Sequence, residues 1–215
     1  NAGIPASAHG GASSSGWKNP SQLSGCDDIF VMPHADPTWG THQNLYDWNL
    51  NHKGNIWAAC HAVSVMEGLS NPAGTIQMNF LSTTGLINYN SHKDGTPPYS
   101  YADHSNPVMQ FMNMMDFATD VGSERIFIPN AGGGWRPSTT VAVYDPTQAD
   151  VPSNSPGPAA VAAYGRGFGD SNRGWVMYEA GHRHNSNGSV AEQVSAQRVF
   201  FNYSFEVASN KNETF

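Results

Sequence analysis

The sequence has little of what marks several common classes of protein. Only two of its 215 residues are cysteine, Cys26 and Cys60, which excludes a framework of several disulfides. Charged residues make up only 13% of the chain, and a net charge of −7 without any run of lysine or arginine argues against nucleic acid as a partner. No apolar run approaches the roughly 20 residues that cross a bilayer, so we expect no membrane insertion.

Small and polar residues take the place of the missing charges. Glycine (22), proline (14), asparagine and serine are abundant, which favours an extracellular or cell-surface location. Three N-glycosylation sequons, which begin at Asn187, Asn202 and Asn212, fit that location. The chain opens with "NAGIPASAHGGASSSGW", which contains neither an initiator methionine nor a signal-peptide pattern. We therefore expect residues 1–25 to be loop-like, in a mature product or a piece of a larger extracellular protein.

The two cysteines are not expected to form a disulfide with each other. Cys26 precedes the apolar run "DDIFVMP", and Cys60 ends the run "NIWAAC". If both runs are neighbouring parallel strands, the two sulfurs lie at opposite edges of the sheet, separated by a strand that spans about 17 Å. The Cα atoms of a disulfide approach within about 7 Å. We therefore expect Cys60 to be a free thiol.

Two successive strand–helix units set the expected fold class, which is α/β. Residues 28–37 and 55–60 have the apolar runs of buried strands, and residues 41–54 and 61–69 have the pattern of helices that follow them. Strands that alternate with helices over short links predict parallel strands with helices on both faces of the sheet.

The rest of the chain gives weaker signals. A final strand is expected at 174–182, followed by an amphipathic helix at 190–205. Residues 70–105 are rich in Asn, Ser, Thr, Gly and Pro, which predicts a long loop-rich insert with one short strand. The other expected elements are a methionine-rich helix at 106–118, strands at 124–129 and 139–146, and a loop at 152–174.

Nucleophilic and titratable residues follow three of the expected strands. Parallel strands present their carboxyl ends at one edge of a sheet, where ligands bind in open α/β folds. We therefore expect one site that contains residues from all three strand ends, namely His34, Asp36, Cys60, His61, Glu179, His182 and His184.

This set of residues predicts nucleophilic catalysis by a thiol. A cysteine at a strand–helix turn is favoured as the thiolate by the positive end of the helix. His182 is the candidate general base, with Glu179, Asp36 or another carboxylate to orient it. The backbone N–H groups around the residue after the cysteine are the candidate oxyanion hole, and the remaining histidines line the pocket, so this second set is His61, His34 and His184.

Three segments carry a resemblance to a known family. "NIWAACHAVSVMEGL" (residues 55–69) resembles the nucleophile elbow of the class I glutamine amidotransferase-like superfamily, which includes intracellular-protease-like and ThuA-like proteins. "RGWVMYEAGHRHN" (173–185) is similar to the ThuA-like segment in which a strand runs into Gly-His. "ADHSNPVMQFM" (102–112) is similar to that group's His-Pro-Ile segment before a helix.

The resemblance implies a flavodoxin-like fold. Residues 1–215 would then form one three-layer αβα domain with a mostly parallel sheet and a long loop-rich insert at 70–105. Two motifs of the superfamily differ in this chain, since Gly-x-Cys-x-Gly is replaced by "AACHA" (58–62) and the usual His-x-Glu by "HRH" (182–184). The acid that orients His182 is therefore left unassigned among Glu179, Asp36 and another carboxylate.

Two functions follow from these residues. The first is a secreted or cell-surface Cys-His thiol hydrolase that acts on an amide or acyl bond. The second is a non-catalytic extracellular structural, assembly or binding module that retains the fold and contacts other copies or glycans. Neither requires a cofactor, although Cys60 with His34, His61 and His184 is also a candidate site for zinc or copper.

Overall fold

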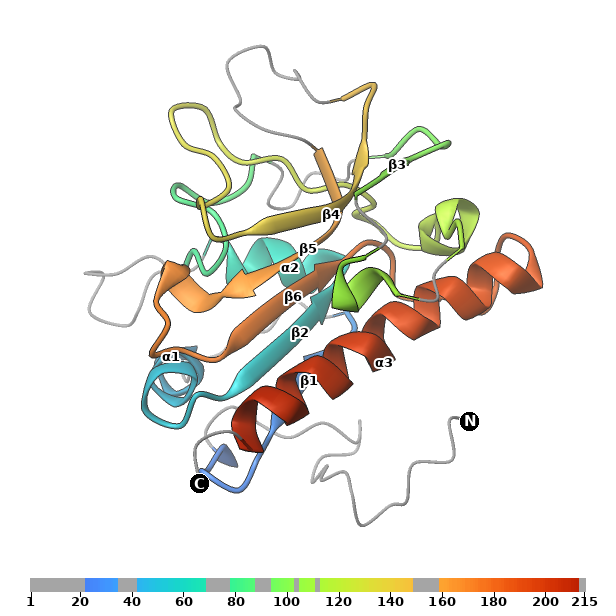
Figure 1. The fold of residues 1–215 in the computed structure, drawn as a ribbon. Coiled ribbons are helices and arrows are strands. Elements are labelled where there is room, and N and C mark those ends of the chain that lie inside the picture. The colour runs from blue at the N-terminus through green and yellow to red at the C-terminus, as the bar shows by residue number, and fades with distance from the viewer. Residues whose placement is uncertain are drawn as a thin grey trace.

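The computed structural model describes residues 22–34, 42–68, 78–87, 94–102, 105–110, 113–148 and 159–212. These residues form an α/β structure around a mixed six-stranded sheet with strand order β1-β2-β6-β5-β4-β3 (Figure 1). The strands are β1 (Ile29–Met32), β2 (Asn55–Ala59), β3 (Ser100–Tyr101), β4 (Thr140–Asp145), β5 (Ala159–Arg166) and β6 (Trp175–Glu179). The α-helices are α1 (His42–Asn51), α2 (His61–Met66) and α3 (Val190–Asn212). The predicted α/β class is confirmed.

Half of the sheet is parallel and positions the expected site. β1 pairs in parallel with β2, and β2 pairs in parallel with β6, so that Phe30, Ile56 and Val176 lie side by side in register. Every residue of β2 is buried, which explains its unbroken apolar sequence. The carboxyl ends of these three strands therefore meet at one edge of the sheet, as the sequence predicted.

The other half of the sheet is antiparallel and corrects two expectations. β6 pairs antiparallel with β5, β5 with β4, and β4 with β3, so the sheet is mixed rather than mostly parallel. The loop expected at 152–174 contains β5, whose first seven residues are buried. The strand expected at 124–129 forms only isolated bridges, such as that between Phe127 and Ala160. The strand expected at 139–146 is present as β4.

Helices lie against both faces of the sheet. In Figure 1, α3 crosses in front of the sheet and α2 lies behind it. The hydroxyl group of Tyr203 on α3 donates to the carbonyl oxygens of Ile56 and Trp175, at 2.8 Å each, and so joins α3 to β2 and β6. α3 begins at a capping box, because Ser189 and Glu192 each accept a hydrogen bond from the other's backbone N–H. The helix expected at 190–205 thus continues to residue 212.

The methionine-rich helix expected at 106–118 is not formed. Within its described residues the chain makes two 3-10 turns, Pro107–Met109 and Asp116–Thr119. Asn106 caps the first turn by accepting a hydrogen bond from the N–H of Val108, and the backbone becomes extended at Gln110. Met109 and Met115 are fully buried, so tertiary packing rather than helix propensity fixes this segment.

A buried glutamate attaches the loop-rich insert to the sheet. Glu67, which follows α2, accepts hydrogen bonds from the backbone N–H groups of Leu81 (2.7 Å) and Ser82 (3.0 Å) and from the hydroxyl groups of Ser82 and Tyr178. Among its described residues, the insert contains one short strand, β3, as expected. Burial raises the pKa of Glu67, while the four hydrogen bonds act in the opposite direction.

The two cysteines are free and lie at opposite edges of the sheet. Cys26 is exposed before β1, and Cys60 is buried directly after β2. Because β1 and β2 are parallel, these positions are a strand length apart, and the expectation of two separate thiols is confirmed.

Of the three sequons, two have asparagine side chains that the structure describes. Asn187 is exposed in the turn before α3. Asn202 lies within α3, and its side-chain amide donates to the carbonyl oxygens of Val108 (3.1 Å) and Gln110 (2.5 Å). The folded chain therefore presents Asn187 to solvent, whereas the amide of Asn202 is engaged. In the part of the chain that the structure describes, no helix combines the length and the apolar character that a membrane span requires.

Candidate active site

Cys60 sits on a strained turn between β2 and α2. Its backbone has φ 51° and ψ −133°, a conformation that residues with a side chain rarely adopt. Its N–H donates to the carbonyl oxygen of Glu179 (3.3 Å), and its own carbonyl oxygen accepts from the N–H of Val63 (3.0 Å). The neighbouring strand and the first turn of the helix thus hold the strained residue from both sides. A sharp strand-to-helix turn of this kind is how nucleophile elbows present their reactive side chain.

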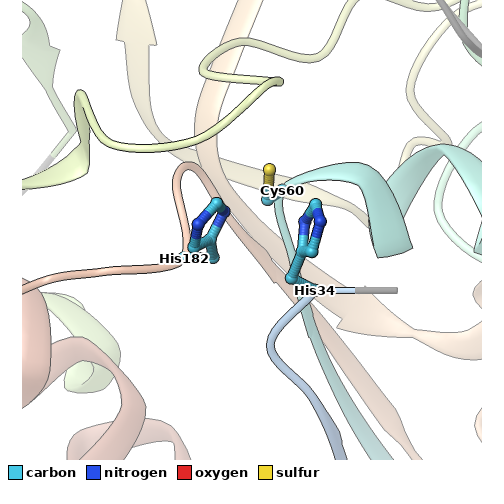
Figure 2. Close-up of side chains that lie close together, drawn as sticks. All are labelled: His34, Cys60 and His182. Carbon is cyan, nitrogen blue, oxygen red and sulfur yellow. The ribbon is translucent and has the colours of Figure 1, made fainter. Parts of the chain in front are cut away.

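Three of the predicted site residues converge at this turn. His34 follows β1, Cys60 follows β2, and His182 lies in the turn after β6 (Figure 2). The Cys60 sulfur and one ring nitrogen from each histidine all lie within 4.8 Å of one another. The rings of His34 and His182 are 4.5 Å apart, centroid to centroid. The parallel half of the sheet therefore brings together residues that are far apart in the sequence.

A segment that the sequence did not single out covers the sulfur. The N–H of Ser123 donates to the sulfur of Cys60 at 3.2 Å, and the thiol donates to the Ser123 hydroxyl oxygen at 3.8 Å. A Cβ atom built on Gly122 would lie 2.8 Å from that sulfur and 3.0 Å from Nδ1 of His182. Glycine at position 122 therefore lets the backbone approach both groups.

Two backbone hydrogen bonds fix this covering segment to the site. The N–H of Gly181 donates to the carbonyl oxygen of Glu124 (3.2 Å), and the N–H of His182 donates to that of Val121 (2.8 Å). No local sequence motif predicts that residues 121–124 lie at the site, because they are placed there by these long-range contacts.

Exposure differs sharply among the three converging side chains. Cys60 is fully buried, His182 is half-buried and His34 is exposed. Of the two histidines with a ring nitrogen within 4.8 Å of the buried sulfur, His34 is the exposed one. Access to the thiol is therefore expected past His34.

The remaining predicted residues are placed elsewhere. Glu179 is fully buried and accepts from the indole N–H of Trp57 (3.2 Å), and its nearest titratable partner is His184, 3.7 Å away. His184 donates from Nε2 to the carbonyl oxygen of Ala180 at 2.9 Å. Burial raises the pKa of Glu179 and lowers that of His184, so the two form a neutral acid beside a neutral imidazole rather than an ion pair.

Two further predicted residues complete this comparison. His61 is buried at the first position of α2, with its ring centroid 6.4 Å from that of His34. Asp36 lies outside the described residues. Glu179 is therefore positioned to contact His184 and Trp57, and the ring placed next to His182 is that of His34.

The environment of His182 favours its neutral form. Burial lowers the pKa of its imidazole, and the charges of His34, Arg183 and His184 lower it further. A neutral imidazole beside a thiol can accept the thiol proton, which is the task of a general base.

We expect NMR titration to show His182 gaining its proton below about pH 6.5, the ordinary histidine value. His34→Gln should move this titration to higher pH, because it removes the neighbouring positive charge.

The same shift makes stability depend on pH. Since the folded pKa of His182 lies below its unfolded pKa, the unfolded chain binds more protons as the pH falls past 6.5, and the free energy of unfolding should fall with the pH. The control is His52→Gln, which replaces an exposed histidine just after α1 and should leave the titration of His182 unchanged. Protonation of His182 at or above pH 6.5 would contradict this account.

Among the described residues, the group whose donor atoms lie close enough to hold a metal ion consists of His34, Cys60 and His182.

Known proteins offer no further guide to the site. A scan against family models, a search of curated proteins and a search of solved structures each found no match to this chain.

Proposed function

We propose that this protein is a cysteine-dependent hydrolase of an amide or acyl bond. The observation that carries the proposal is the strained backbone of Cys60 at a strand–helix turn, with His182 beside its sulfur. A residue other than glycine keeps such a conformation only where the surrounding structure enforces it, and residues of this kind cluster at active sites. A buried cysteine that served only to fill space would not need this backbone.

The reaction would proceed through a thioester. His182 accepts the proton of Cys60, and the sulfur attacks the carbonyl carbon of the substrate. The C–N or C–O bond then breaks, and His182 returns the proton to the departing amine or alcohol. Water, activated by His182, attacks the thioester carbon, releases the carboxylic acid and restores the thiol. The N–H of Ser123, which donates to the sulfur at 3.2 Å, is the donor that we assign to the developing oxyanion.

Two features support a class I glutamine amidotransferase-like framework for this hydrolase. One is the parallel order β1-β2-β6, with the cysteine after β2 and the histidine after β6. The other is the elbow conformation of Cys60. We propose that the chain is a single, divergent three-layer domain of this kind, in which β3, β4 and β5 extend the sheet. The low charge and the exposed Asn187 fit an extracellular or cell-surface location.

Native-state alkylation tests the proposed nucleophile. Iodoacetamide is added to the folded Cys26→Ser variant, so that Cys60 is the one remaining thiol, and the modified protein is measured by mass spectrometry across pH. We expect Cys60 to react without unfolding. His182→Gln should slow the reaction at pH 7 by about tenfold or more, because the base that receives the thiol proton is lost.

Two controls make the alkylation result specific. His52→Gln removes an exposed histidine before β2, at the opposite edge of the sheet, and should not change the rate. p-Nitrophenyl acetate should leave one acetyl group on Cys60, seen as a mass increase that Cys60→Ser abolishes. Labelling of Cys60 only after unfolding in urea, or a rate that His182→Gln leaves unchanged, would overturn the proposal.

A second candidate function is an assembly or binding module without catalysis. It is favoured by four large apolar side chains that are exposed near the start of α3, namely Met114, Phe117, Val190 and Val194. Their segments are joined, because the N–H of Phe117 donates to Glu192 and the N–H of Asn113 donates to Ser195. A thiol that stays unreactive until the protein unfolds is the result that favours this function.

A further inference from the structure

Cys60 and two histidines also have the composition of a metal site. Their donor atoms, one from each side chain, lie within 4.8 Å of one another and come from three segments of the chain (Figure 2). All three segments are anchored in the parallel half of the sheet, which holds the donors at fixed positions. A thiolate with imidazoles is a soft to borderline donor set that suits zinc and disfavours calcium or magnesium, which take oxygen ligands.

Two features of the site fit a bound ion. Nδ1 of His182 is buried and has no hydrogen-bond partner among the described residues. The position of the missing Cβ at Gly122 is 2.8 Å from the Cys60 sulfur and 3.0 Å from that same nitrogen. Residue 122 thus places no side chain against the thiol or against this ring nitrogen.

We propose that His34, Cys60 and His182 bind a zinc-class divalent cation, with a fourth position open to solvent or to a small ligand. Zinc binds sulfur at about 2.3 Å and nitrogen at about 2.0–2.1 Å, which sets donor atoms roughly 3.5 Å apart in a tetrahedral site. The donors therefore need to approach one another by only about an ångström from their limit of 4.8 Å. His34 is exposed and can make this movement at little expense in packing.

The hydrogen bond from Ser123 supports this assignment. Its N–H donates to the sulfur at 3.2 Å, the kind of outer contact that orients a metal-bound thiolate and tunes its charge. Binding releases the thiol proton to solvent as the Zn–S bond forms, so the affinity should rise with pH. The proposal does not depend on catalysis, although a metal-bound sulfur is unavailable as a nucleophile.

Metal titration of the folded, untagged protein tests the site. Co²⁺, a spectroscopic substitute for zinc, should give a near-ultraviolet sulfur-to-cobalt band that saturates at one equivalent in wild-type and Cys26→Ser protein. Cys60→Ser should abolish the band. Zn²⁺ affinity, from competition with a chromophoric chelator, should fall by about tenfold or more in His34→Gln and in His182→Gln. His52→Gln should leave the affinity unchanged.

Gly122→Ala provides an additional variant, since it keeps all three donors and places a methyl group against two of them. It should weaken Zn²⁺ binding by about tenfold or more, provided that its circular dichroism spectrum matches that of the wild type. If Gly122→Ala does not fold, the metal site is tested by Cys60→Ser, His34→Gln and His182→Gln alone. Absence of a cobalt band, or Zn²⁺ affinity equal in wild type and His34→Gln, would overturn the metal site. Neither result bears on the alkylation rate of metal-free Cys60, so the two proposals fail separately.

Discussion

Glu67→Ala is expected to lower the free energy of unfolding by about 3 kcal/mol or more. The glutamate is fully buried and accepts four hydrogen bonds, from two backbone N–H groups and two hydroxyl groups. Alanine would leave those donors buried without an acceptor, and each unsatisfied donor costs about 1–3 kcal/mol. It would also remove the hydrogen bonds that join Leu81 and Ser82 to Glu67. Urea unfolding followed by tryptophan fluorescence measures the loss.

Glu67→Gln separates the hydrogen bonds of this group from its charge. It keeps one acceptor oxygen and should destabilise the protein less than alanine does. Burial raises the pKa of Glu67, so the folded chain binds this proton more tightly than the unfolded chain does. The resulting contribution to the free energy of unfolding is largest below about pH 4.5 and is lost as the pH rises through the pKa of Glu67 in the folded chain. The difference between wild type and Glu67→Gln should therefore be largest in acid and shrink toward neutral pH. Equal stability of wild type and Glu67→Ala would show that the insert is held by other contacts.

Cys60→Gly is expected to be more stable than Cys60→Ala by about 1 kcal/mol, although both lose the thiol completely. The two variants lack sulfur and differ only by one methyl group. At φ 51° that methyl group is strained, whereas glycine adopts the conformation freely. Chemical unfolding gives the stability difference, and alkylation of each variant in the Cys26→Ser background should give no product.

Ala62→Gly provides the matched control for this comparison. Ala62 is buried within α2, where the backbone is helical, so glycine should destabilise the protein by about 1 kcal/mol. An opposite sign at positions 60 and 62 would locate the strain at the elbow itself. If Cys60→Ala proved the more stable of the first pair, the backbone at position 60 would be relaxed and the main support for a nucleophile would be gone.

The parallel half of the fold was predictable because its sequence signals are local. β1, β2 and β6 are short apolar runs, and the turn residues that follow them define the edge where they meet. β5 is built largely from alanine and glycine, so its sequence does not predict a strand. Such residues carry little strand propensity, yet small side chains suit a central strand that is packed on both faces. The segment at 106–118 failed for the opposite reason, since its helical composition is overridden by the burial of Met109 and Met115.

The candidate site likewise contains residues that the sequence predicts and residues that it does not. Cys60, His182 and His34 could be placed from the ends of their strands, because strand order and direction fix where these ends lie. Gly122 and Ser123 could not, since an irregular segment gives no pattern from which its position can be inferred. Glu179 was one of the carboxylates expected to orient His182, but its fully buried side chain contacts His184 and Trp57 instead.

The position of β6 in the sheet determines when the surroundings of Cys60 can form during synthesis. β6, the last strand among the residues that the structure describes, lies between β2 and β5, so the middle of the sheet closes only after residues 175–179 have been made. Until then Cys60 lacks its backbone partner at Glu179 as well as His182, the residue beside its sulfur. A ribosome-bound chain that ends before residue 175 therefore carries an ordinary cysteine on an unstrained backbone. The backbone conformation on which the proposed nucleophile depends therefore forms in the same step that completes the sheet.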